Sequence, residues 1–244
     1  MKYNEISHFS HPHHNLKFEY TEAPFKCDGC KEAGIGSRYK CCGGGGYGGG
    51  GGCNYDLHTH CAIHSPSINH PFYTKCSFQF LSRPPGTVAR YCNACQKDVT
   101  GFVYHCKLCG FDLHPCCAKL PMMLDDGETK LCGRKGRSWS YRSSCKKYNL
   151  HVACVKEMLV DSWHELYYGS GGDARGNKYT GDRRLETLIP SLRDTLQTHN
   201  HKKSKGKAQK CCEMAGLALQ FVISAVLGDP TTLIAGLVGT LMSK

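Results

Sequence analysis

Residues 92–117 read CNACQKDVTGFVYHCKLCGFDLHPCC, and this stretch decides the fold. It contains a Cys-x2-Cys pair, a second Cys-x2-Cys pair ten residues later, and then a His-x2-Cys pair. Thiolates and imidazoles at such close spacing are the donors of tetrahedral structural zinc sites. The sequence therefore predicts that zinc holds this stretch together. The candidate ligands are Cys92, Cys95, Cys106, Cys109, His114 and Cys117.

The same arrangement of donors occurs once upstream and, in reduced form, once downstream. An aromatic residue, a polar residue and leucine precede the histidine of every copy, as in Tyr55-Asp56-Leu57-His58. This internal similarity predicts related modules. The last copy lacks a partner for its first cysteine, so we expect one zinc there at most, or a packed remnant without metal. The candidate ligands are Cys27, Cys30, Cys41, Cys53, His58 and Cys61 upstream, and Cys132, Cys145, His151 and Cys154 downstream.

The first copy carries an insertion between Cys41 and Cys53. Residues 43–52 are all glycine except Tyr47, and such a run predicts a flexible loop. The longer link costs about 1.2 kcal/mol of closure entropy, against roughly 10 to 16 kcal/mol for zinc-coupled folding. We therefore expect a weakened but intact module, in which Cys41 is a ligand and Cys42 is the alternative.

The composition also argues for small metal-bound modules. The 244 residues include 28 glycines and 18 cysteines, and the mean hydropathy is −0.42, which does not describe one large apolar core. The first residues form no apolar signal segment, so we expect a reducing compartment, the cytoplasm and/or the nucleus, and metal rather than disulfides. The formal charge of +11 falls to about +7 once four zinc-thiolate sites are counted, so charge alone is weak evidence for a nucleic-acid partner.

We expect a fold of small zinc-stabilised α+β modules in tandem, each with short β-hairpins and a short helix, followed by an α-helical C-terminal tail. The apolar run 215–227 and the capped start at Asp229-Pro230 predict two helices in the tail. The expected units are module 1 at 8–64 with the insertion at 43–52, module 2 at 70–120, a truncated module 3 at 130–158, a linker at 162–181, and the tail at 183–244 with a basic segment at 202–210.

These motifs resemble the plant cysteine/histidine-rich proteins built of divergent C-one domains, relatives of the phorbol-ester/diacylglycerol-binding zinc domain of protein kinase C. The resemblance covers about residues 8 to 157 and implies two interleaved zinc sites per module, about four zinc ions in all. The first cysteine pair would join the His-x2-Cys pair, and the second pair would join a preceding histidine and a trailing donor. The ligand sets it implies are Cys27, Cys30, His58 and Cys61, and Cys92, Cys95, His114 and Cys117.

The flanking ligands stay open. His14 stands at the family's usual distance before Cys27, although His11 and His13 compete with it, and the trailing donor of module 1 would be His70 or Cys76. In module 2, Cys106 and Cys109 need partners, for which the candidates are Cys76, His70 and Cys132.

We expect no enzymatic activity. A structural zinc site has four protein ligands and no position for water, and the glycine run lacks the Lys-Ser/Thr of a phosphate loop. The resemblance implies a zinc-binding signalling adaptor with a protein partner, in plant signalling or stress responses. The loops at 31–40 and 96–105 lack the Trp and the Gln-Gly pair that shape the lipid groove of relatives, so diacylglycerol is not an expected ligand.

Three alternatives compete with this hypothesis. The lysines of 202–210, Cys211-Cys212 and the apolar run 215–227 could attach the protein peripherally to a membrane surface, although a helical hairpin explains them as well. A plant-homeodomain-finger-like chromatin reader needs a closing cysteine pair that the modules lack, and a thiol oxidoreductase needs a strand-to-helix unit around its Cys-x2-Cys. Nucleic acid is not an expected partner, because the basic segment has no interleaved aromatic residues.

Overall fold

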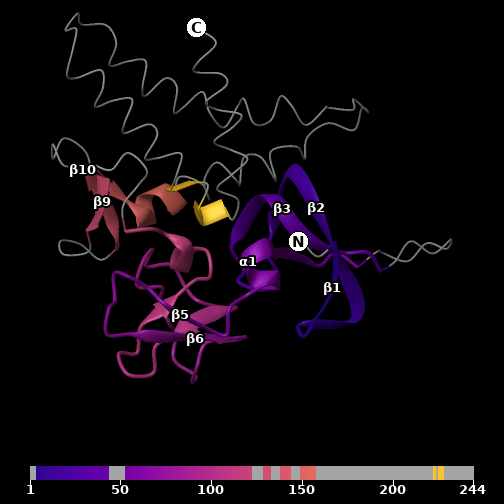
Figure 1. Cartoon of the computed structure of the whole chain (residues 1–244), viewed down its shortest axis with the longest axis horizontal. Helices are drawn as coiled ribbons and strands as arrows, with labels where there is room; N and C mark the ends of the chain where they lie inside the picture. The colour runs from indigo at the N-terminus through magenta and orange to yellow at the C-terminus, as the bar shows by residue number, and fades with distance from the viewer. Residues whose placement is uncertain are drawn as a thin grey trace, which may run out of the picture.

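Three antiparallel sheets follow one another along the chain (Figure 1). The structure is a computed structural model that describes residues 4–43, 53–122, 129–132, 138–143, 149–157, 222–223 and 225–227, and the side chains of 22, 23 and 129–132 are outside this description. The described part is β-rich with a few short helical turns, as small zinc modules are, which confirms the coarse prediction of the fold class. The exact module bounds stay predictions.

The first sheet has the order β1-β2-β3-β4. Its strands are β1 (Glu5–His8), β2 (His11–Lys26), β3 (Ala33–Cys41) and β4 (Asp56–His58), and the short helix α1 (Thr59–Ala62) follows directly. A register shift between Ile6 and His8 marks an irregularity in the pairing of β1 with β2. Leu16, Phe25, Tyr39 and Leu57 are buried beneath this sheet.

The second sheet has the order β5-β6-β7-β8. Its strands are β5 (Ser67–Asn69), β6 (Ser77–Leu81), β7 (Val103–His105) and β8 (Asp112–Leu113), and a 3₁₀ turn, Cys117–Lys119, closes the unit. The third sheet has the order β11-β10-β9, from β9 (Thr129–Cys132), β10 (Ser140–Ser143) and β11 (Asn149–His151), and residues 152–157 are helical.

A tyrosine lies opposite a leucine at the same place in all three sheets. The pairs are Tyr39 with Leu57, Tyr104 with Leu113, and Tyr141 with Leu150. Each leucine directly precedes the histidine of a His-x2-Cys motif, so this cross-strand pair positions the histidine at the strand end. Small apolar contacts of this kind are all the core that a metal-stabilised module needs.

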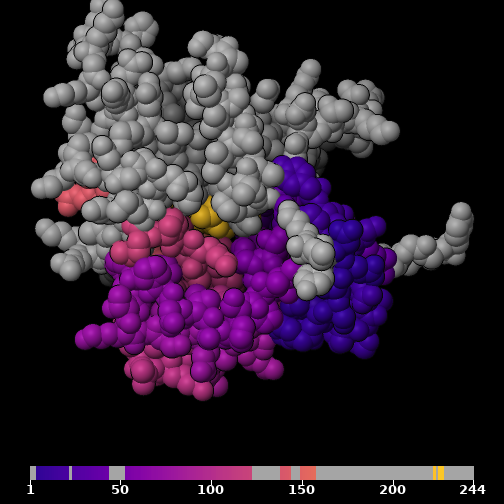
Figure 2. Space-filling model, in the orientation of Figure 1, coloured from indigo at the N-terminus to yellow at the C-terminus, as the bar shows by residue number. Residues whose placement is uncertain are grey.

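The first two units contact each other directly (Figure 2). The N–H of Phe102 donates to the carbonyl of Gly29 at 2.8 Å, and the Phe102 ring is buried with the core of the first sheet. A Cβ at Gly101 would lie 2.1 Å from the Gly29 oxygen, so only glycine permits this approach. The second and third sheets share one core, which includes Trp139 and Tyr141.

Part of the C-terminal apolar run packs on the same core. Residues 222–223 and 225–227 are helical, and Val222, Ala225 and Val226 are buried in the core shared by the second and third sheets. The predicted linker at 162–181, the basic segment at 202–210, Cys211 and Cys212 lie outside the described residues, so the helical tail as a whole stays a prediction. Among the described residues, no helix has the length and apolar character needed to span a membrane.

Candidate metal centres

The three Cys-x2-Cys turns share one backbone geometry. The carbonyl of the first cysteine accepts the N–H of the residue four positions on, and its N–H donates to the carbonyl of the residue after that. The residue four positions on has positive φ in every case: 65° at Lys31, 61° at Gln96 and 67° at Gly110. This tight turn aims both sulfurs at one point, as a metal requires.

A second link joins each of the first two turns to its His-x2-Cys motif. In the first unit, Asp28 donates its N–H to the carbonyl of Asp56 at 2.7 Å and accepts the Asp56 N–H on its carboxylate at 2.9 Å. In the second unit, Asn93 and Asp112 make the same two bonds, each at 2.8 Å. The polar residue before each Leu-His therefore fixes the histidine beside the cysteine pair.

The first centre consists of Cys27, Cys30, His58 and Cys61, all buried. Nδ1 of His58 lies 3.3 Å from the sulfur of Cys30 and 4.0 Å from that of Cys61. Nε2 of the same ring lies 3.0 Å from the carbonyl of Ala33. Because Nε2–H donates to that carbonyl, the bare Nδ1 faces the sulfurs and can bind a metal.

The second centre consists of Cys92, Cys95, His114 and Cys117, again all buried. Nδ1 of His114 lies 3.4 Å from the sulfur of Cys95, and Nε2 lies 2.9 Å from the carbonyl of Asp98. The histidine therefore has the same tautomer and orientation as in the first centre. These two donor sets are the ones that the family resemblance implies.

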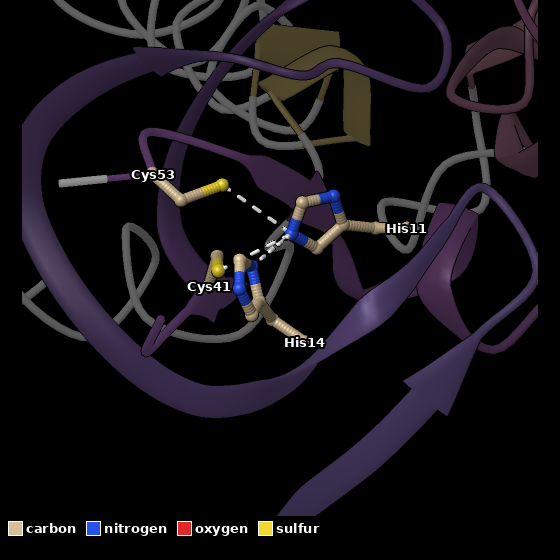
Figure 3. Close-up of side chains that lie close together, drawn as sticks. All are labelled: His11, His14, Cys41 and Cys53. Carbon is tan, nitrogen blue, oxygen red and sulfur yellow. Dashed lines mark hydrogen bonds between the residues drawn. The ribbon is translucent and has the colours of Figure 1, made fainter. Parts of the chain in front are cut away.

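The third centre is half-exposed and consists of His11, His14, Cys41 and Cys53 (Figure 3). Nε2 of His11 lies 3.2 Å from the sulfur of Cys41, 3.3 Å from that of Cys53, and 3.3 Å from Nδ1 of His14. The resemblance implied one preceding histidine and a trailing donor, whereas here two preceding histidines complete the set. His11, which competed with His14 in the sequence, lies beside it.

The glycine run begins against this third centre. A Cβ at Gly43 would lie 2.5 Å from Cγ of the His14 ring, and the N–H of Gly43 donates to the sulfur of Cys41 at 3.2 Å. Cys42 is exposed and is not a member of the group. The geometry therefore favours Cys41 over Cys42 as a ligand.

The fourth group consists of Cys76, Cys106 and Cys109. The sulfurs of Cys76 and Cys109 lie 3.2 Å apart. His70 is not a member of this or any other group, because both of its ring nitrogens have hydrogen-bond partners: Nε2 faces the carbonyl of Leu120 at 2.9 Å and Nδ1 accepts the N–H of Phe72 at 3.2 Å. The structure thus differs from the sequence-based expectation for His70.

Within the described residues, the third copy contains only part of a candidate metal site. Nδ1 of His151 lies 3.9 Å from the exposed sulfur of Cys154, while Cys145 and the side chain of Cys132 are outside the description. The strand register allows the third sheet to be compared with the first. Arg142 pairs with Asn149 in the third sheet, and Lys40 pairs with Asp56 in the first. The residue after Arg142, which is Ser143, therefore occupies the position of Cys41. A ligand position of the complete modules is therefore a serine here.

The clustered thiols perturb one another's ionisation strongly. Hydrogen bonds from Cys117 and Cys92 lower the pKa of Cys95, whereas hydrogen bonds with Cys116 and Cys92 raise the pKa of Cys117. Burial alone would lower the pKa of His58, yet the neighbouring Cys27 thiolate holds that pKa above its usual value. A divalent cation resolves this competition, because it accepts every sulfur as thiolate and the imidazole as neutral.

The donor atoms fit tetrahedral zinc. Zn–S bonds of 2.3 Å and Zn–N bonds near 2.0 Å place neighbouring ligand atoms about 3.5 to 3.8 Å apart. The sulfur–nitrogen distances of 3.3 to 4.0 Å in the two buried centres bracket this range, and all donor atoms within each group lie within 4.8 Å of one another. Zinc would supply structural cross-linking here.

The comparisons with known proteins agree with this chemistry. Residues 69–118 match the family model of the C1 domain, which includes the complete second centre. The chain therefore contains a Cys/His-rich C1-like zinc domain, and the predicted resemblance to C-one domains is confirmed. Comparison with curated proteins and with solved structures gives no match.

Two residues beside the second centre carry no signal in the sequence. Glu32 and Lys156 lie beside the second centre although they are distant from it in sequence. No local motif points to either residue, since each belongs to a different sheet unit from the ligands. Only the packing of the units brings them together.

Proposed function

We propose that this protein is a zinc-scaffolded, non-catalytic interaction protein of the C1 type, which acts as an adaptor in signalling. The observation that carries the proposal is the pair of centres in which four donors are all buried. Four protein ligands saturate zinc and leave no position for a substrate or a reactive water. Such a metal holds loops in place, and the loops do the binding.

The second unit presents apolar side chains on loops next to its metal groups. Leu108 is 88% exposed and stands between Cys106 and Cys109, and Val88 is 79% exposed in the segment between β6 and the second centre. A metal-fixed loop loses little conformational entropy when it binds. These residues therefore suit docking to a protein partner. We further propose that the adaptor acts in the cytoplasm and/or the nucleus.

Membrane attachment through the apolar run has less support. Val222, Ala225 and Val226 of that run are buried in the protein core, where they cannot also insert into lipid. The loops at 31–40 and 96–105 also lack the residues that shape the lipid groove of the family's lipid-binding relatives. The adaptor proposal therefore needs no membrane.

The test compares partner capture by the zinc-loaded chain and by Leu108→Asp, with Lys107→Asp as the control on the same turn. In-cell proximity labelling should recover a specific set of proteins with the wild type and the control, and lose it with Leu108→Asp. The zinc-loaded chain should also fail to reduce disulfide substrates. An unchanged set with Leu108→Asp, or turnover of a disulfide substrate, would contradict the proposal.

A further inference from the structure

A carboxylate from the first sheet unit reaches the metal-ligating histidine of the second. Oε1 of Glu32 lies 3.0 Å from Nε2 of His114, on the side of the ring that faces away from the sulfurs. Glu32 follows the Cys27–Cys30 turn, and its carbonyl accepts the N–H of Cys27 at 2.9 Å. The first centre therefore fixes the position of a side chain that contacts the second.

A buried lysine from the third unit completes the contact. Nζ of Lys156 pairs with Oε2 of Glu32, and only 4% of the lysine side chain is exposed. Lys156 lies in the helical residues 152–157, two positions after Cys154. Burial opposes the charge of this ammonium, and the Glu32 carboxylate, itself only 16% exposed, is the partner that compensates it.

The backbone of the third unit covers the same turn of the second centre. The N–H of Trp139 donates to the carbonyl of Ala94 at 2.8 Å, and Ala94 lies between the ligands Cys92 and Cys95. An exposed ion pair, Lys97 with Glu157 at 3.3 Å, joins the same two units at the edge of this contact. The third copy thus packs against the second centre through its main chain and its side chains.

Charge explains why both side chains are needed. A zinc ion with three thiolates and one imidazole carries a net charge of about −1, and a buried carboxylate beside it adds a second negative charge. Removing such charges from water is costly unless they are paired. Lys156 supplies the positive charge. Nε2–H of His114 faces two acceptors, the Asp98 carbonyl at 2.9 Å and Oε1 of Glu32 at 3.0 Å. Glu32 thus adds a charged acceptor to the carbonyl that already leaves Nδ1 free for the metal.

We propose that the metal centre of Cys92, Cys95, His114 and Cys117 is completed by Glu32 and Lys156, which the first and third units supply as positioning residues. Both lie outside the segment 69–118 that matches the C1 domain. The third copy then serves as a cover for the second centre, whatever its own metal content. The inference rests on zinc occupancy of that centre and on no particular partner.

The test measures metal retention at each centre of the full chain separately. Cadmium-113 NMR of the cadmium-loaded protein reports each centre, and His58→Ala and His114→Ala assign the two signals of the buried three-cysteine centres. The variants are Glu32→Ala, Glu32→Gln and Lys156→Met. The matched control is Glu157→Gln, which removes the exposed ion pair between the same units.

Loss of an outer-shell partner lowers metal affinity about 10- to 100-fold. We therefore expect Glu32→Ala and Lys156→Met to bind metal about 10 to 100 times more weakly in competition with a chelator, at the second centre alone. Glu32→Gln keeps an oxygen that accepts the Nε2 proton, so its loss should be smaller, and Glu157→Gln should match the wild type.

Equal retention in Glu32→Ala and Glu157→Gln would overturn the proposal, and so would an equal loss at both buried centres, which would indicate general unfolding. Glu32→Gln preserves the shape of the side chain and keeps the test decisive if the alanine variant folds poorly. A wild-type chain that takes up no metal would refute the proposed zinc scaffold itself, which is a separate outcome.

Discussion

His70 shows at the scale of one residue why a histidine near metal ligands need not be one. Its ring is buried, contacts Trp139 with centroids 4.7 Å apart, and has a hydrogen-bond partner at each nitrogen. The Phe72 N–H points at Nδ1, so a proton on Nδ1 would meet another donor. Burial accordingly lowers the pKa of His70, although the Leu120 carbonyl opposes this in part.

The lowered pKa makes the stability of the second unit depend on pH. Below the ordinary histidine pKa of about 6.5 the unfolded chain binds a proton that the folded chain rejects, so the free energy of unfolding falls as the pH falls. The slope from one group cannot exceed about 1.4 kcal/mol per pH unit. His70→Gln removes this ionisation, so denaturant unfolding of the zinc-loaded chains should show a shallower loss on acidification than the wild type. Parallel pH profiles for the two proteins would contradict this account of His70.

At the scale of the element, the Cys-x2-Cys turn explains how a short sequence builds a rigid site. Its residue four positions after the first cysteine must adopt positive φ, which costs an ordinary side chain about 1 to 2 kcal/mol. Gly110 avoids that cost, but Lys31 and Gln96 do not. Two backbone hydrogen bonds hold the turn in this conformation, and a bound metal would add to them.

Lys31 allows this strain to be measured. Lys31→Gly relieves about 1 to 2 kcal/mol of strain and adds about 0.5 to 1 kcal/mol of backbone entropy cost, so it should raise the free energy of unfolding of the zinc-loaded chain by about 0.5 to 1 kcal/mol. Lys31→Val should lower it by about 1 to 2 kcal/mol, because a β-branched residue tolerates positive φ worst. Lys31→Ala is the control for the exposed ion pair of Lys31 with Asp28, and it should stay near the wild type. If the glycine variant is no more stable than the alanine variant, the turn is not strained.

The spacing of the donors was enough to predict the turns and the residues of the two buried centres. Each of these centres takes its four donors from a Cys-x2-Cys pair and a His-x2-Cys pair of the same module. The spacing left the flanking ligands open, because they depend on how distant strands pair. His11 and His14 reach Cys41 and Cys53 because β2, which contains both histidines, pairs with β3, which ends at Cys41. Glu32 and Lys156 could not be found from the sequence, since their role depends on contacts between units.

At the scale of the whole molecule, the units contact one another through their metal turns. The third residue of the first turn, Gly29, accepts the N–H of Phe102 from the second unit, and Ala94 of the second turn accepts that of Trp139 from the third. The same turn that positions two ligands thus also receives the next unit. A metal bound at a turn would therefore order its own unit and also the surface on which the next unit packs.

Metal content per chain tests the central claim most directly. The zinc-to-protein ratio of the chain purified under reducing conditions should be measured by native mass spectrometry, with His58→Ala and His114→Ala in parallel. We expect one zinc ion for each of the four groups of donors, and the loss of one ion in each variant. A folded wild-type chain that contains no zinc and has its cysteines joined as disulfides would contradict it.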